Sequence, residues 1–272
     1  MTTPKPRTAA DRVALARNPL RPSVTDYIDH LFTGFFELCG DRRQAEDASI
    51  LGGLAFYKGT PVTVIGHRKG KTLEENLRMN FGMSSPEGYR KAQRLMRQAE
   101  KFKRPIITFI DTPGAYPGIE AEARGQGEAI ASCLALMSRL TVPTIAVVTG
   151  EGGSGGALAL GVADRIFMLE NAVFSVLSPE GFATILWKDA SRSQEAAEIM
   201  RLTAQDLLTL GVIDGIIHEP PNGAHEEPAS VYLALDAVLT RELSVLCAQS
   251  GDALRKSRYK KLRAIGNRKE AL

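Results

Sequence analysis

Two segments near the middle of the chain constrain its fold more than any others. Each is a short, continuously apolar run followed at once by a glycine-rich turn and a helical pattern: PIITFID leads into TPGAYPG, and VPTIAVVTG leads into EGGSGG. Strands that are apolar throughout are typical of parallel sheets covered on both faces. Helices between such strands supply the crossovers that parallel pairing requires. The two segments therefore predict an α/β fold with a largely parallel sheet.

The flanking patterns predict the other elements. Apolar residues at helical spacing favour a helix over residues 25–39, and ILGGLAFYKGTPVTVIG favours two strands joined at Lys58–Gly59. The basic segment that begins HRKGKT lacks periodicity and is expected to be a loop, which ends where Ser85 and Pro86 start a helix. Further along we expect strands at RIFMLE and AVFSVLS, helical structure over 191–210, a strand at GVIDGII and a helix over 228–249.

Most of the chain is expected to form one domain. The 272 residues are 44% hydrophobic and 24% charged, which is an ordinary globular composition. We expect an extended arm with one short helix over 1–20, an α/β domain over 21–250 and a basic tail over 251–272. The net charge of +3 hides a tail that carries eight Lys and Arg against two acids, so the body is weakly acidic. Such a charge distribution argues against a dedicated nucleic-acid-binding protein.

The sequence also bears on where the protein works. No apolar run approaches the roughly 18 to 20 residues that a membrane span needs, and the N-terminal segment lacks the apolar stretch of a secretory signal. The three cysteines, Cys39, Cys133 and Cys247, lie far apart, which fits reduced thiols better than a disulfide framework or a zinc site. We therefore expect a cytoplasmic protein that binds no membrane and holds no metal.

The glycine-rich turns are the candidate functional site. Each turn is expected at the carboxyl end of a strand and at the start of a helix, where unpaired backbone N–H groups favour negative charge. The amides of Gly155, Gly156 and Ala157 could hold an enolate or thioester oxygen, with Gly114 and Ala115 supplying facing amides. Glycine would there let a ligand approach the backbone closely. Because the turns close consecutive strands, we expect them to face one cleft.

Other interpretations of these turns stay open. Gly150, Gly152 and Gly155 spell GxGxxG, and Glu170 follows at a distance that suits a dinucleotide site, although the return is short for a Rossmann unit. GHRKGKT lacks the spacing of a P-loop. The glycines could also serve only tight turns, with Asp111 and Glu151 as capping residues. GxSxG and HExxH are absent, and no Asp, Glu or His set is evident near the turns, which favours stabilisation of an oxyanion by backbone amides.

Longer motifs reveal a family resemblance. These are FIDTPGAYPG (109–118), GEGGSGGALALGV (150–162), SVLSPEGFATILWKDAS (175–191) and LTAQDLLTLGVIDGIIHEP (202–220), and the match extends over about 21–249. Together they closely resemble the carboxyltransferase alpha subunit of multi-subunit bacterial acetyl-CoA carboxylase. The resemblance implies a crotonase-like ββα superhelix with flanking helices.

The resemblance also implies an activity and partners. The expected reaction moves the carboxyl group of carboxybiotin, held on the biotin carboxyl carrier protein, to acetyl-CoA, and so forms malonyl-CoA for fatty acid synthesis. A zinc-ribbon beta subunit would complete an alpha2beta2 carboxyltransferase, while ATP would be used only by the separate biotin carboxylase. Biotin and metal would thus lie on other chains. The alternative is a stand-alone crotonase-like acyl-CoA hydratase or isomerase, which the lack of an acid/base set disfavours.

Carried over residue by residue, the family's site falls on the two turns. The resemblance implies that Gly155, Gly156 and Ala157 form the oxyanion hole for the biotin ureido oxygen, opposite Gly114 and Ala115. It further suggests that the biotin pocket is lined by Gly152, Gly153 and Tyr116. Candidates for contacts with the CoA phosphates are Lys69, Lys71, Arg78 and the basic tail, although solvated surface is the simpler expectation for each.

Overall fold

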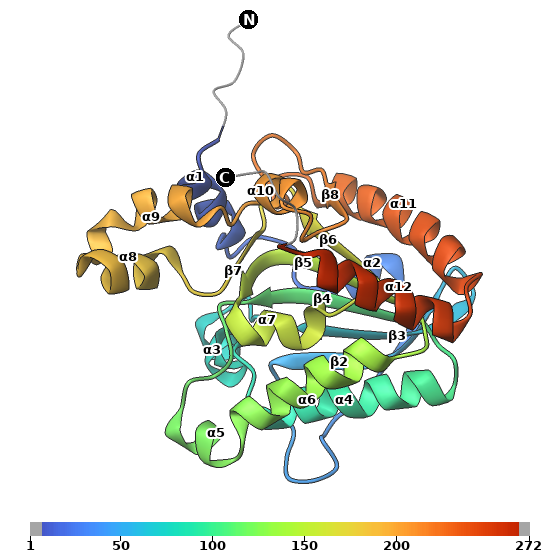
Figure 1. The fold of residues 1–272 in the computed structure, drawn as a ribbon. Helices are drawn as coiled ribbons and strands as arrows, with labels where there is room; N and C mark the ends of the chain where they lie inside the picture. The colour runs from blue at the N-terminus through green and yellow to red at the C-terminus, as the bar shows by residue number, and fades with distance from the viewer. Residues whose placement is uncertain (1–6, 267–272) are drawn as a thin grey trace, which may run out of the picture.

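The sheet expected from the sequence lies at the centre of the molecule, with helices packed on both faces (Figure 1). The computed structural model describes residues 7–266. Within them the strands run in the order β1-β2-β3-β4-β5-β6-β8, and β7 pairs with β5. Pairing is antiparallel among β1, β2 and β3 and parallel from β3 onward. The strands are β1 (Thr33–Glu37), β2 (Ile50–Tyr57), β3 (Thr60–His67), β4 (Ile106–Thr112), β5 (Thr144–Gly153), β6 (Arg165–Leu169), β7 (Val173–Ser175) and β8 (Gly215–Ile217).

The turn between β2 and β3 is the two-residue hairpin that the sequence predicts. Lys58 and Gly59 both have positive φ, at 46° and 81°. A two-residue turn of this kind matches the twist of antiparallel strands and so fixes their register.

Helices cover the sheet in two layers. On one face lie α4 (Pro86–Lys101), α6 (Gln126–Arg139) and α7 (Ser154–Gly161), and on the other α2 (Val24–Leu31) and α11 (Pro228–Cys247). The ring of Phe109 stacks on Tyr27 of α2, with centroids 5.3 Å apart. The neighbouring Ile110 points to the other face, toward Gly161 of α7. Successive residues of β4 are thus buried on opposite faces, which explains why the strand is apolar throughout.

The helix expected over 25–39 is shorter than predicted. It ends at Leu31, because Phe32 is extended and residues 33–37 pair with β2 as an edge strand. Gly34 has a φ of +62°, a conformation that suits glycine and bends the edge. The segment after β3, which we expected to be a loop, contains the short helix α3 (Leu73–Arg78). A capping box between Thr72 and Glu75 starts this helix.

Near both ends of the described residues, helices replace much of the arm and the tail that we expected. The expected short helix is α1 (Ala9–Ala16), while residues 1–6 and 267–272 lie outside the described part. Residues 251–264 form the helix α12 (Gly251–Ala264) instead of a solvated tail. Its Arg258 is fully buried, where it pairs with Asp164 at 2.9 Å and donates to the carbonyls of Met137 and Leu140. This guanidinium docks α12 on the body.

The remaining helices complete the molecule. Helix α5 (Ile119–Ala123) precedes α6, and α10 (Ala204–Thr209) precedes β8. The expected helical region around 191–210 begins earlier than predicted, at α8 (Pro179–Trp187), which with α9 (Ser193–Met200) projects beyond the end of the sheet (Figure 1). None of the helices within 7–266 combines the length and the apolar character required to cross a bilayer.

Candidate active site

The two glycine-rich turns, which we expected to face one cleft, lie directly against each other. A β-carbon placed on Gly156 would come within 2.8 Å of the Ala115 amide nitrogen and of the Gly114 carbonyl carbon. A β-carbon on Gly153 would lie 2.1 Å from the Pro113 carbonyl oxygen. Glycine at these two positions is therefore required by contact between the turns, a reason that the sequence did not indicate.

Space remains at two other glycines of the turns, Gly114 and Gly155. A β-carbon on Gly114, which has a φ of +154°, would meet no atom within 4 Å, and one on Gly155 would meet only the side chain of Ile130, at 3.5 Å. The turn is held from beneath, since the Gly114 amide donates to Thr112 Oγ1 and the Tyr116 amide donates to the Ser84 carbonyl. Part of the expected cleft is thus open beside Gly114.

Three backbone amides at this contact are candidates to bind an acceptor, those of Gly155, Gly156 and Ala115. Gly155 and Gly156 stand in the first turn of α7, where helical N–H groups have no intrahelical acceptor. The amide of Ala115, which lies outside any helix or strand, has no acceptor within residues 7–266. Amides at a helix start that lack acceptors are suited to an anionic oxygen.

The structure separates some residues that we expected to share one pocket. Gly152 and Gly153 belong to the end of β5, where they pair with Phe174 and Ser175 of β7. They line a small cavity of about 40 Å³ on the α1 side of the turn, together with Pro113. Tyr116 follows the open turn, and its carbonyl accepts a hydrogen bond from Gln126 Nε2.

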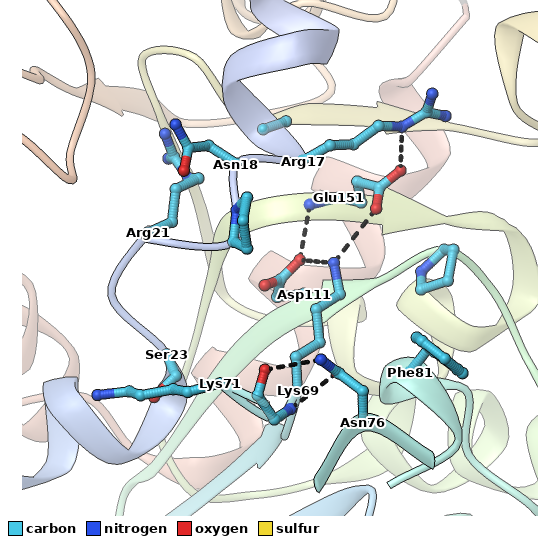
Figure 2. Close-up of a pocket in the computed structure, with 14 residues that line it drawn as sticks. Arg17, Asn18, Arg21, Ser23, Lys69, Lys71, Asn76, Phe81, Asp111 and Glu151 are labelled. Atoms are coloured by element: carbon cyan, nitrogen blue, oxygen red, sulfur yellow. Dashed lines mark hydrogen bonds and ion pairs between the residues drawn. The ribbon is translucent and has the colours of Figure 1, made fainter. Parts of the chain in front are cut away.

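A larger cavity of about 320 Å³ opens at the same edge of the sheet (Figure 2). Pro113 of the first turn and Glu151 of the second both line it, beside the connection from α1 to α2. Lys69 Nζ lies between two carboxylates, 2.7 Å from Asp111 Oδ1 and 3.2 Å from Glu151 Oε2. Arg17 Nε donates to Glu151 Oε1 at 2.8 Å. Charged side chains from four separate segments thus meet at the ends of β4 and β5.

This charged cluster corrects two expectations. Asp111 and Glu151 are not isolated capping residues, so a set of acids does lie near the turns. Lys69 is not solvated surface, because its side chain is only 23% exposed. Burial lowers the pKa of Lys69, but the two carboxylates outweigh it and leave the pKa above its usual value. Lys71 and Arg78 do lie at the surface, and Lys71 pairs with Asp26.

Two buried polar rings flank the contact between the turns. Tyr89 of α4 places its hydroxyl 3.0 Å from the β-carbon position of Gly156, and His67 ends β3 beside the backbone of Gly156. Among residues 7–266, neither the Tyr89 hydroxyl nor the ring nitrogens of His67 has a hydrogen-bond partner. Burial lowers the pKa of His67 to about 4, so its ring is neutral at pH 7. Neither residue stood out in the sequence as a site residue.

Comparison with known proteins identifies the family. The family model described as acetyl co-enzyme A carboxylase carboxyltransferase-like matches residues 5–266. The acetyl-coenzyme A carboxylase carboxyl transferase subunit alpha of Geobacillus thermodenitrificans is 60% identical over 256 residues, or 94% of this chain and 79% of the relative. The chain belongs to this family. The corresponding subunit of Bacillus thuringiensis is 59% identical over the same shares.

Solved structures agree on the fold. A transcarboxylase 12S structure matches with a TM-score of 0.68 at 19% identity, over 87% of this chain and 45% of that one. A Pseudomonas malonate decarboxylase hetero-dimer matches with a TM-score of 0.65 at 18% identity, over 81% and 91%. The crotonase-like α/β class is thereby confirmed.

Family membership decides between the enzyme classes considered. As a carboxyltransferase alpha subunit of acetyl-CoA carboxylase, the chain is part of a transferase, and the stand-alone hydratase or isomerase is not supported. The dinucleotide hypothesis is not supported either. It needs Glu170 to bind a ribose, but the Glu170 carboxylate already accepts a hydrogen bond from the Glu219 amide and contacts His218.

Proposed function

We propose that the facing turns hold the ureido oxygen of carboxybiotin while its carboxyl group moves to acetyl-CoA to give malonyl-CoA. The amides of Gly155 and Gly156, with Ala157 behind them, would donate to that oxygen, and Gly114 and Ala115 would face them. Tyr116 would line the open side of this site, and Gly152 and Gly153 would border it from the small cavity on the α1 side. The observation that carries the proposal is the contact between the turns, which brings the first-turn amides of α7 beside the Ala115 amide within residues 7–266.

The chemistry asks for amides and not for a side-chain nucleophile. Carboxybiotin, carried on another protein, supplies the carboxyl group and, once that group has left, a nitrogen that can accept the acetyl proton. What the chain must do is stabilise the negative charge that develops on the ureido oxygen and align the reacting groups. Backbone amides fixed at a helix start do this without reorganisation at the moment of reaction.

The active site is proposed to be completed by a second chain. The enolate of acetyl-CoA needs an oxyanion hole of its own, and residues 7–266 provide one pair of facing turns. We assign the second to a zinc-ribbon beta subunit in an alpha2beta2 assembly, served by the biotin carboxyl carrier protein and by a biotin carboxylase that alone uses ATP. Apolar side chains exposed on and before α8, including Val176, Ile185 and Leu186, support burial in an assembly.

We place this chemistry in the cytoplasm, with no metal on this chain. The thiols of Cys39, Cys133 and Cys247 are unpaired, and Cys39 and Cys247 are exposed, which is typical of a reducing compartment.

Reconstitution tests the proposed function. The chain mixed with the beta subunit should form malonyl-CoA from acetyl-CoA and carboxylated carrier protein, and each subunit alone should not. Full transfer by the chain alone, with the beta subunit shown to be absent, would contradict a site shared between subunits.

A further inference from the structure

We propose that Lys69 is a positioning residue that holds the two glycine-rich turns in the arrangement their amides need. The proposal rests on the proposed function of the turns. It is based on the contacts of Lys69 and on an irregularity in the sheet beside it.

The ladder between β4 and β5 breaks just before the turns. Ile110 pairs with Val148, but Thr112 pairs with Gly152, so β5 contains extra residues opposite Asp111. A bulge of this kind removes regular backbone hydrogen bonds and changes the direction of the strand that follows. The orientation of the second turn therefore depends on the contacts that replace the missing hydrogen bonds.

Side chains replace those bonds on both strands. Asp111 Oδ1 accepts from the Glu151 amide at 2.9 Å, and the Asp111 carboxylate fills the space beside Gly150, where a β-carbon would lie 2.5 Å from Oδ1. The guanidinium of Arg21 donates twice to the Thr149 carbonyl, at 2.8 and 3.1 Å. Side-chain hydrogen bonds from Asp111 and Arg21 thus hold the backbone of the bulge in place.

Lys69 links the two sides of this break. Its ammonium donates to Asp111, just upstream of the first turn, and to Glu151, just upstream of the second (Figure 2). Both carboxylates are mostly buried, with side-chain exposures of 18% and 15%. Without the ammonium the two acids would repel each other across the bulge, because charges in a poorly solvated site interact strongly.

The expected consequence falls on the chemical step. Displacement of one turn relative to the other would misplace the amides of Gly155, Gly156 and Ala115, and a misplacement of about 1 Å can cost about 100-fold in rate. Substrate binding, which draws on contacts elsewhere and on the partner subunit, would change little. A loss in kcat at constant KM separates this role from general destabilisation.

The test uses Lys69→Met in the reconstituted enzyme, with Lys58→Met as matched control. Lys58 is also paired, with Asp236 at 2.7 Å, but it lies at the β2–β3 turn, away from the site. We expect Lys69→Met to lower kcat by about 10- to 100-fold with both KM values within about twofold. Lys69→Arg, whose guanidinium can also bridge two carboxylates, should recover most of the loss.

A second readout does not depend on activity. Amide hydrogen exchange over residues 113–116 and 153–157 should accelerate in Lys69→Met and remain unchanged in Lys58→Met. Wild-type kcat and unchanged exchange in a folded Lys69→Met enzyme would overturn the positioning role. If the wild-type complex itself transfers no carboxyl group, the proposed function fails, while the exchange comparison still tests the link between the turns.

Discussion

The amide nitrogen of Ala115 occupies the space that a side chain on Gly156 would need, 2.8 Å from the position of its β-carbon. The two turns are therefore interlocked through their backbones. One movement displaces the amides on both sides, so the geometry of the site is a property of the pair and not of either loop.

The first prediction contrasts the two adjacent glycines. Gly156→Ala should abolish most carboxyl transfer, by about 100-fold or more, because the new methyl group pushes the facing turns apart and misplaces the donors. It should also lower the melting temperature. Gly155→Ala is the matched control, since its methyl group meets only Ile130 at 3.5 Å. This variant should fold normally. It should keep at least about a tenth of the rate, because its backbone amide is retained and loss of a donor altogether costs about 100-fold or more. Equal effects of the two substitutions on kcat would contradict the interlocked arrangement.

The second prediction concerns the buried ion pair that docks α12. Arg258 and Asp164 are almost fully inaccessible, with side-chain exposures of 0% and 3%. Arg258→Met should lower the free energy of unfolding by about 3 to 5 kcal/mol, because it leaves the Asp164 carboxylate buried without its partner. Urea denaturation of the chain measures this. The exposed pair between Arg255 and Asp252 on the same helix provides the control, and Arg255→Met should change stability little. A small effect of both substitutions would contradict this account, and would show that α12 is held by its other contacts, such as the Lys261–Asp214 ion pair.

The third prediction is a pH dependence of stability. Burial holds the pKa of His67 at about 4, below the unfolded value of 6.5. Between these values the unfolded state binds a proton that the folded state does not. The free energy of unfolding is therefore unaffected by His67 above pH 6.5 and falls as the pH drops toward 4. The loss would reach about 3 kcal/mol.

His67→Leu removes this titration and serves as the comparison. Its free energy of unfolding should decline less steeply than that of the wild type between pH 6.5 and 4, while the carboxylates contribute equally to both proteins. Above about pH 6.5, where the ring is neutral in the folded and the unfolded state, the difference between the two proteins should not change with pH. Parallel profiles for the two proteins would mean that His67 is protonated in the folded state.

The centre of the fold was predictable because local pattern and tertiary environment agree there. β4 and β5 are buried on both faces, so burial imposes an unbroken apolar run, and the second turn needs glycine at Gly153 and Gly156 for its contact with the first. The Lys58–Gly59 hairpin was equally predictable, since its geometry is local.

Elsewhere tertiary contacts outweighed the local pattern. Phe35 and Leu38 continue the helical spacing of α2, yet an edge of β2 was available and the segment pairs with it. Arg258 lies in a run of basic residues that resembles a solvated tail, and its burial depends on Asp164, 94 residues away. Lys69 is 42 residues from Asp111, so no local pattern indicates that the two meet. Such pairings are set by the arrangement of strands.

The most direct test of the account is which substrate covers the two turns. In the reconstituted enzyme, hydrogen exchange over residues 113–116 and 153–157 should slow when biotinylated carrier protein is added and should change little with acetyl-CoA alone. Acetyl-CoA would instead protect the partner subunit. Protection of these turns by acetyl-CoA, with none from the biotinylated carrier, would contradict the assignment of the facing amides to the biotin side of the reaction.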